Sequence, residues 1–187
     1  MNSRQEGLAV RQPDRSASGP VDVPASGQYR LDPGRSSVTF RSRHLFGLAA
    51  VTGTMQVTSG EVTVDPAVPQ ASVTATLSAS SFSTGNRARD RDVRSAKFLD
   101  TGQYPEITFT AETLSQAQGH WMLAGELTVH GVGRPVTLTI ESIERAEGGF
   151  RARATTRIDR YAFGLTAAKG MAARHLGIEL TAAAGRA

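Results

Sequence analysis

The chain has no cysteine and no long hydrophobic run. The absence of cysteine excludes a disulfide framework, thiolate zinc sites, iron–sulfur clusters and cysteine nucleophiles. No stretch approaches the roughly 20 consecutive apolar residues that a membrane-spanning helix needs. The 187 residues, of which 39% are hydrophobic and 20% charged, suffice for one globular domain, or for one domain with a tail.

Lysine is scarce: of the 21 basic residues, only Lys97 and Lys169 are lysines, and the others are arginines. The net charge of the chain is +4, and the positive charge gathers at residues 87–97 and from Arg151 onward. Such regions attract nucleic acid, anionic lipid headgroups or pyrophosphate, or they form a merely solvated face. We expect no nucleic-acid binding, because the interleaved aromatic residues typical of single-strand binders are missing.

Residues 1–27 are rich in Ser, Gly, Pro and charge and show no hydrophobic periodicity. This composition predicts a disordered polar tail, since it buries too little apolar surface to offset the entropy of ordering. The stretch also lacks the apolar region of a secretory signal, its longest apolar run being Leu8–Val10. We therefore expect a cytoplasmic protein whose folded domain covers residues 28–187.

Apolar and polar residues alternate in many segments after Tyr29, which is typical of antiparallel strands with one buried face. Turn signals separate these segments, and Gly148–Gly149 between two of them predicts a hairpin. The residues after Asn86 are instead compatible with a short helix, for which Asn86 or Thr84 is available as the N-cap. The clearest alternating segments are 38–41, 73–77, 107–110, 136–141 and 150–154.

Seven to nine such strands must bury their apolar faces together, either in a sandwich or in a closed barrel that also removes exposed edges. An eight-stranded antiparallel barrel is just wide enough for a packed interior or for one small ligand. Small residues at inward positions favour a cavity, because Leu or Phe would fill the space. These small residues are Ala49, Gly53, Ala75, Ala111, Ala124, Gly125, Ala152 and Ala154.

Five ordered blocks of the sequence resemble the YceI-like family from about Tyr29 to Ala183. The most specific block runs from Ser81 to Phe109 and contains Arg89-Asp90, Phe98-Leu99 and Tyr104-Pro105. The others are Tyr29–His44, Val51–Val62, Gly125–Val136 and Ile158–Gly164. The resemblance implies an all-β, lipocalin-like barrel that binds polyisoprenoid and related long-chain lipids, with one or two short helices. It also implies a possible homodimer.

A lipid pocket needs an apolar bore and a few polar groups at one mouth. His44 is expected to point inward and to bond either a ligand headgroup or the backbone, and Arg89 belongs to the family's Arg-Asp pair. Asp90 and Arg94 have the spacing of an ion pair on one helix face. The remaining candidates, which line a bore or fill a core, are Phe40, Phe46, Phe82, Phe98, Phe109, Trp121, Leu123, Leu127, Leu138 and Phe163.

The favoured hypothesis is a non-catalytic carrier that holds a long-chain isoprenoid, a quinone-like molecule or another amphiphilic lipid, without a cofactor. The alternative is an enzyme acting on a lipid, with His44 and a nearby carboxylate such as Asp90 as the acid–base pair. Motifs of serine hydrolases, zinc proteases and phosphate-binding loops are missing from the sequence. The four histidines are scattered, so we expect no metal site.

Overall fold

The computed structural model describes residues 21–44, 49–65, 70–117 and 119–187. These residues form nine β-strands, one α-helix, α1 (Arg87–Arg94), and one 3-10 helix, η1 (Arg160–Phe163). The strands are β1 (Gly27–Leu31), β2 (Ser37–His44), β3 (Ala49–Asp65), β4 (Gln70–Ser83), β5 (Glu106–Ala117), β6 (His120–Val129), β7 (Val132–Ala146), β8 (Gly149–Asp159) and β9 (His175–Arg186).

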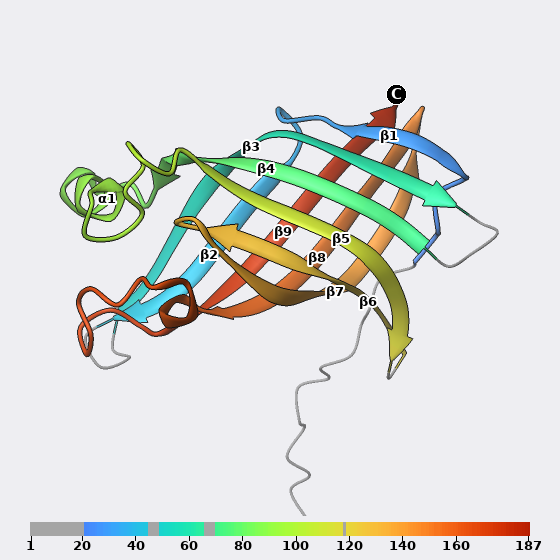
Figure 1. The fold of residues 1–187 in the computed structure, drawn as a ribbon. Coiled ribbons are helices and arrows are strands. Elements are labelled where there is room, and N and C mark those ends of the chain that lie inside the picture. Colours follow the sequence, from blue (N-terminus) through green and yellow to red (C-terminus); the bar gives the residue numbers. More distant parts are fainter. Residues whose placement is uncertain (1–20, 45–48, 66–69, 118) are drawn as a thin grey trace, which may run out of the picture.

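The strands form one closed antiparallel barrel (Figure 1). The order around it is β3-β2-β9-β8-β7-β6-β5-β4, and a pairing of β4 with β3 closes the ring. β1 has the same two neighbours as β2 but lies farther along them, so that Tyr29 pairs with Val62 whereas Val38 pairs with Met55. β1 and β2 therefore share one of eight positions, and the predicted eight-stranded barrel with one or two short helices is confirmed.

The alternation of the sequence sorts side chains between the inside and the outside of the barrel. In β8, Phe150 and Ala154 are buried while Arg151 and Arg153 are exposed. The predicted hairpin between β7 and β8 is also confirmed. Gly148 has a φ of +71°, a left-handed conformation that glycine adopts without the strain of a side chain.

A close approach between β2 and β3 depends on a second glycine. Gly53 pairs with Phe40 across the two strands, and a Cβ atom at Gly53 would lie only 2.1 Å from Cζ of Phe40. Without that Cβ, the Phe40 ring lies over the strand and stacks on Phe82, with their ring centroids 4.7 Å apart. This pair belongs to the larger of two buried apolar clusters.

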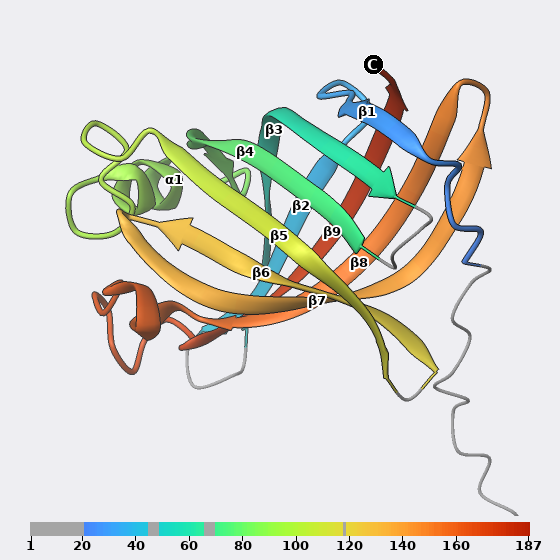
Figure 2. The same cartoon turned by 45° about the vertical axis from the view of Figure 1, so that its right-hand side comes forward.

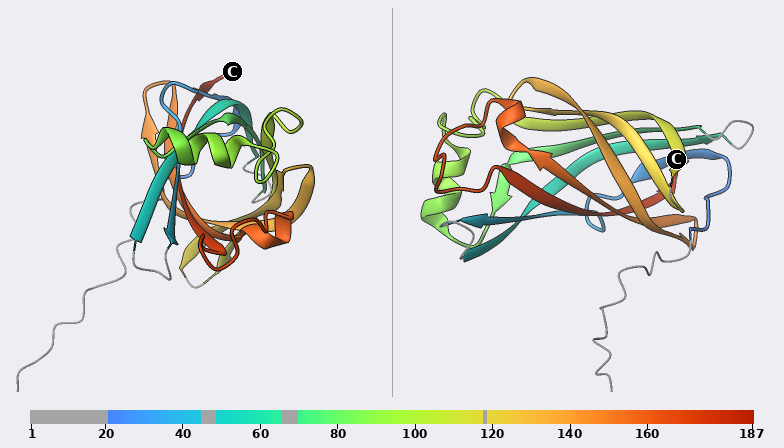
Figure 3. Two further views of the ribbon diagram at one scale, coloured as in Figure 1. Left: turned by 90° about the vertical axis from the view of Figure 1, so that its left-hand side faces the viewer. Right: turned by 90° about the horizontal axis from the view of Figure 1, so that it is seen from below.

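The two ends of the barrel are built from different elements. α1 and the segment 160–174 lie at one end, which we call the α1 end, and β1 and the C-terminus lie at the other, the β1 end (Figures 1 and 2). A view along the barrel shows α1 running across the first end (Figure 3). The described residues include no helix that is both long and apolar enough to cross a membrane.

Residues 21–23 belong to the segment that the composition predicts to be disordered, and they lie against β7. Val21 forms a parallel bridge with Ile143, and the backbone N–H of Asp22 donates to the Ile143 carbonyl at 2.9 Å. Nε of Arg145 lies 3.0 Å from the Asp22 carboxylate. These residues therefore have partners distant in sequence, which local composition does not reveal.

Candidate functional site

The barrel encloses a cavity of about 840 Å³ whose lining is overwhelmingly apolar. Inward side chains of every strand from β2 to β9 contribute to it, and residues of α1 and of the segment 160–174 border it at the α1 end. Solvent-exposed residues also line it at both ends, Asp92 and Met171 at the α1 end and Val23 at the β1 end. The cavity therefore runs along the barrel rather than forming an isolated void in its core.

The structure brings almost all of the predicted site residues together on this cavity. Phe46 lies outside the described residues; His44 is the last residue of β2, and its side chain also lies outside the described part. Of the small residues predicted to leave internal space, Ala75, Ala152 and Ala154 are on the wall, whereas Gly53, Ala111, Ala124 and Gly125 are not among the lining residues. The other predicted site residues all line the cavity: Phe40, Phe82, Arg89, Phe98, Phe109, Trp121, Leu123, Leu127, Leu138 and Phe163. Their role in binding a ligand stays a prediction.

Several lining residues were missing from the candidate set. Most are aliphatic residues at inward positions of predicted strands, so the period of two could have found them. Arg160 and Met171 are different, because they come from the irregular segment before β9, where no periodicity applies. Examples of these aliphatic residues are Val136, Ile140, Ile143, Ile158, Ile178 and Leu180.

α1 begins as expected, with Asn86 as its N-cap accepting a hydrogen bond from the backbone N–H of Arg89 at 3.0 Å. The expected ion pair between Asp90 and Arg94 is wrong. Asp90 instead accepts hydrogen bonds from the backbone N–H of Thr84 at 2.9 Å and from its hydroxyl at 2.5 Å. Arg94 donates to the carbonyl of Phe82 through Nε at 3.1 Å and through a second guanidinium nitrogen. Both side chains therefore fasten the helix to the end of β4.

The Asp90 carboxyl is buried, with 6% of its residue surface exposed. Burial by itself raises the pKa of Asp90. The hydrogen bonds from Thr84 and Ser83, together with the charge of Arg94, outweigh burial and hold the pKa below its ordinary value. Asp90 is thus an ionised structural anchor whose Oδ1 accepts both hydrogen bonds from Thr84.

Arg89 is half-buried and borders the cavity beside α1. Its Nε donates to the Thr84 hydroxyl at 2.8 Å, and that hydroxyl in turn donates to Asp90. The hydrogen bond fixes the position of the guanidinium group at the rim of the cavity. Arg87 and Arg91, on the same helix, are exposed.

Arg160 holds the segment 160–174 against the barrel. It is buried, and its guanidinium group donates to the carbonyls of Ala173 at 2.8 Å, Ala172 at 3.2 Å and Leu165. Burial lowers the pKa of Arg160. None of the ion pairs among the described residues includes Arg160. One side chain therefore ties together both halves of the segment that borders the α1 end of the cavity.

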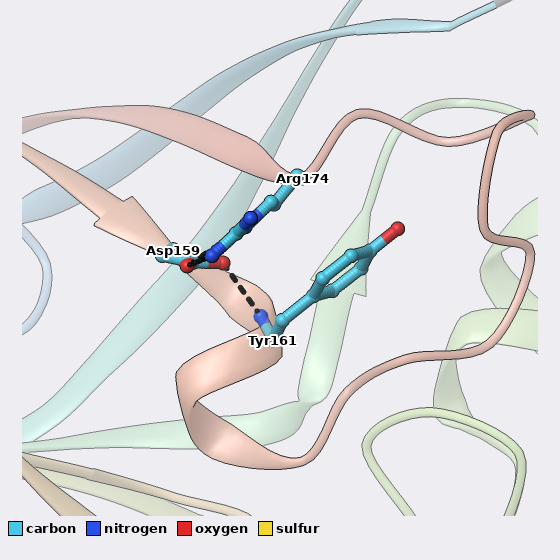
Figure 4. A network of polar contacts seen from close by, with 3 residues as sticks. All are labelled: Asp159, Tyr161 and Arg174. Carbon is cyan, nitrogen blue, oxygen red and sulfur yellow. Dashed lines mark hydrogen bonds and ion pairs between the residues drawn. The ribbon is translucent and has the colours of Figure 1, made fainter.

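A polar contact at the base of this segment joins its two ends (Figure 4). The Asp159 carboxylate accepts from the backbone N–H of Tyr161 at 2.9 Å and from Nη2 of Arg174 at 2.6 Å. The hydrogen bond from Arg174 lowers the pKa of Asp159; partial burial raises it by less, and the Tyr161 N–H adds to the lowering. The Tyr161 ring lies 5.3 Å from the Arg174 guanidinium carbon.

Charged side chains along the cavity are few and unevenly placed. Arg89, Asp92 and Arg160 border it at the α1 end, and Asp65 borders it at the β1 end. In the described part of the chain, no three His, Asp or Glu side chains gather in a way that could hold a metal ion. The site is thus an apolar bore with most of its charge at one mouth.

A closed antiparallel barrel with an apolar interior defines a lipocalin-like β-barrel protein. Residues 29–184 match the model of the YceI-like domain, and the chain belongs to this family. A UPF0312 protein of Shewanella baltica is 32% identical over 152 residues, covering 78% of this chain and 79% of the relative. Protein YceI of Escherichia coli O157:H7 is 35% identical over 130 residues, covering 66% and 68%.

Two solved structures share the fold at low sequence identity. BcnA of Burkholderia cenocepacia has a TM-score of 0.71 and 22% identity, covering 81% of this chain and 98% of its own. A polyisoprenoid-binding domain from Saccharophagus degradans, implicated in plant cell wall breakdown, has a TM-score of 0.62 and 14% identity, covering 85% and 98%. Both likenesses support the barrel architecture.

Proposed function

We propose that this protein is a non-catalytic carrier that holds a long-chain amphiphilic lipid, isoprenoid or quinone-like, inside the barrel. The observation that carries the proposal is the continuous apolar cavity of about 840 Å³. This volume falls within the roughly 300–1,000 Å³ usual for small-molecule sites. Each methylene group transferred from water to such a wall contributes about 0.8 kcal/mol, so a long chain binds with little polar help. The polyisoprenoid-binding domain of similar fold adds support.

The distribution of charge favours one orientation of the ligand. Arg89, Asp92 and Arg160 border the α1 end of the cavity, whereas the middle of the barrel is lined by side chains such as Leu123 and Ile140. A polar headgroup loses least hydration when it stays near charged groups at a mouth. We therefore place the headgroup at the α1 end and the hydrocarbon chain along the bore.

The state of Asp90 supports a role in binding rather than in catalysis. A general acid or base works best with a pKa near the operating pH. The pKa of Asp90 is held below its ordinary value, and its Oδ1 already accepts two hydrogen bonds from Thr84. A carboxylate in this state is a poor partner for His44 in proton transfer.

The first test asks what the purified protein contains. Denaturing extraction followed by mass spectrometry should release a long-chain lipid in an amount comparable with that of the protein. Leu123→Arg places a guanidinium group in the bore, so we expect loss of the lipid and several kcal/mol of destabilisation, as for an unpaired buried charge. Glu126→Arg places the same side chain at an exposed position of β6 and should retain the lipid.

A second variant separates blocking of the bore from unfolding. Ala154→Leu adds apolar volume to the cavity wall without burying a charge. We expect it to remain folded and to retain less lipid than the wild type. A protein that binds no lipid, or that converts an added lipid into a product with loss of turnover in His44→Ala, would contradict the carrier function.

A further inference from the structure

The α1 end of the barrel concentrates the positive charge of the molecule. The segments 84–104 and 160–174 together contain eight basic and three acidic residues, a net charge of +5 in a chain whose total is +4. One of the three acids, Asp90, is buried and held by Thr84. The exposed basic residues of the two segments are Arg87, Arg91, Lys97, Lys169 and Arg174, of which Arg174 is paired with Asp159.

An exposed methionine lies within this basic surface. Met171 is 65% exposed, and among the described residues the only other exposed large hydrophobic side chain is Val23, at 43%. Single exposed apolar residues are common and need no explanation. Met171 differs from a scattered residue in two respects, because Lys169 and Arg174 are close to it in the same segment and because it borders the mouth of the cavity.

The turn that presents Met171 is held by hydrogen bonds. The backbone N–H groups of Met171 and Ala172 donate to the Ala168 carbonyl at 3.1 and 2.9 Å. Arg160 binds the carbonyls of Ala172 and Ala173 from beneath. Met171, which is 65% exposed, therefore lies on a turn that hydrogen bonds support. The Lys169 ammonium group lies 5.3 Å from the centroid of the Tyr161 ring.

We propose that the α1 end docks on the surface of an anionic lipid bilayer, with Met171 entering the interfacial layer. Exposed lysine and arginine side chains attract anionic headgroups, each with about a fivefold effect on partitioning near the surface. One apolar anchor combined with a basic patch gives reversible rather than permanent attachment. Docking in this orientation would bring the charged mouth of the cavity to the membrane surface. Charge complementarity selects a bilayer with anionic lipid over a neutral one.

This proposal goes beyond lipid carriage and is tested without any cavity ligand. Purified protein is sedimented with vesicles of phosphatidylcholine, with or without phosphatidylglycerol. We expect binding to the anionic vesicles that falls steeply as salt is added, and little binding to the neutral ones. Lys169→Glu should weaken binding at least about tenfold, because it replaces an attraction by a repulsion. Met171→Asp should weaken it by a similar factor through the lost apolar anchor.

The chain offers a matched control at the opposite end of the barrel. Val23→Asp also removes an exposed apolar side chain that borders the cavity, but Val23 lies outside the basic segments. It should bind anionic vesicles as the wild type does. Equal losses in Val23→Asp and Met171→Asp, or equal binding to neutral vesicles, would overturn the proposal. Binding to a short single-stranded DNA but not to the vesicles would also overturn it and assign the basic surface to nucleic acid.

The cavity variant keeps the two proposals apart. Ala154→Leu reduces lipid content if the carrier function is right, and it should leave vesicle binding unchanged because Ala154 lies on the interior wall. Loss of vesicle binding in Ala154→Leu would contradict docking through the surface. Failure of the vesicle experiment with normal lipid content would remove the docking proposal alone.

Discussion

The elements at the two ends of the barrel are held in place by different kinds of interaction. At the β1 end, β1 continues the sheet between β3 and β9, and the rings of Tyr29 and Phe150 pack edge to face with centroids 5.1 Å apart. At the α1 end, the segment 160–174 and the residues after α1 bury Leu99, Phe163 and Leu165 in the core. Side chains that bond to backbone groups supply the polar contacts there. Arg94 bonds Phe82 in this way, and Arg160 bonds the carbonyls of its own segment.

The difference has a consequence for how each end responds to damage. Backbone pairing and aromatic packing at the β1 end belong to the sheet and its core, so they break only when the barrel unfolds. The fastenings at the α1 end involve single side chains outside the strand ladders. We therefore expect the α1 end to loosen before the barrel does, which makes it the natural place for a ligand to pass in and out.

The largest effect should follow removal of a core ring at the β1 end. Phe150 is 6% exposed and packs on Tyr29, so Phe150→Ala should lower the free energy of unfolding by about 3–5 kcal/mol. Phe98→Ala, at the α1 end, removes a ring that is only half-buried and should cost about 1–2 kcal/mol. Denaturant unfolding measures both. Equal losses would show that Phe98 contributes to the core as much as Phe150 does.

Much of the barrel could be predicted because its strands follow the local alternation of apolar and polar residues. Val136, Leu138 and Ile140 alternate with polar residues, and all three line the cavity. Closure into a barrel rather than a sandwich followed from the need to remove edges and from the family blocks. The sharing of one position by β1 and β2 could not be predicted, because it depends on their register with β3 and β9.

The α1 end was harder to predict, since its contacts join residues that no periodicity relates. Helical spacing suggested a pair between Asp90 and Arg94, but Thr84 and the Phe82 carbonyl compete for the two side chains. The carbonyls that Arg160 binds lie 5 to 13 residues ahead in an irregular segment. Only the path of that segment brings these groups together.

The second largest loss of stability should follow removal of the side chain that supports the segment 160–174. Arg160→Met keeps an apolar stem but removes the donors to Leu165, Ala172 and Ala173. We expect a loss of about 2–3 kcal/mol, since hydrogen bonds to a charged group are strong but removing a buried charge recovers part of their loss. Limited proteolysis should cut between residues 164 and 174, with the strands intact. Arg157→Met, at an exposed position of β8, is the control and should leave the cleavage pattern unchanged.

The smallest expected effect is a loss of stability in acid, and it should again distinguish the two ends of the barrel. The pKa of Asp90 is lower in the folded protein than its ordinary value of 3.8. The ionised carboxylate therefore stabilises the fold at neutral pH, and this contribution is lost as the pH falls below about 4 and through the lowered pKa. Asp90→Asn should cost about 1–2 kcal/mol at pH 7 and progressively less in acid, because the wild type then loses the same contribution.

Denaturant unfolding at a series of pH values measures this convergence, with Asp92→Asn as the control on an exposed position of the same helix. Asp159, whose pKa is also lowered, lies at the α1 end as well. As the pH falls below about 4, proteolysis of the wild type by an acid-active protease should therefore begin within 84–104 and 160–174 while β1 stays paired with β3 and β9. Cleavage that begins at β1 instead would mean that the α1 end is not the part of the barrel that opens first.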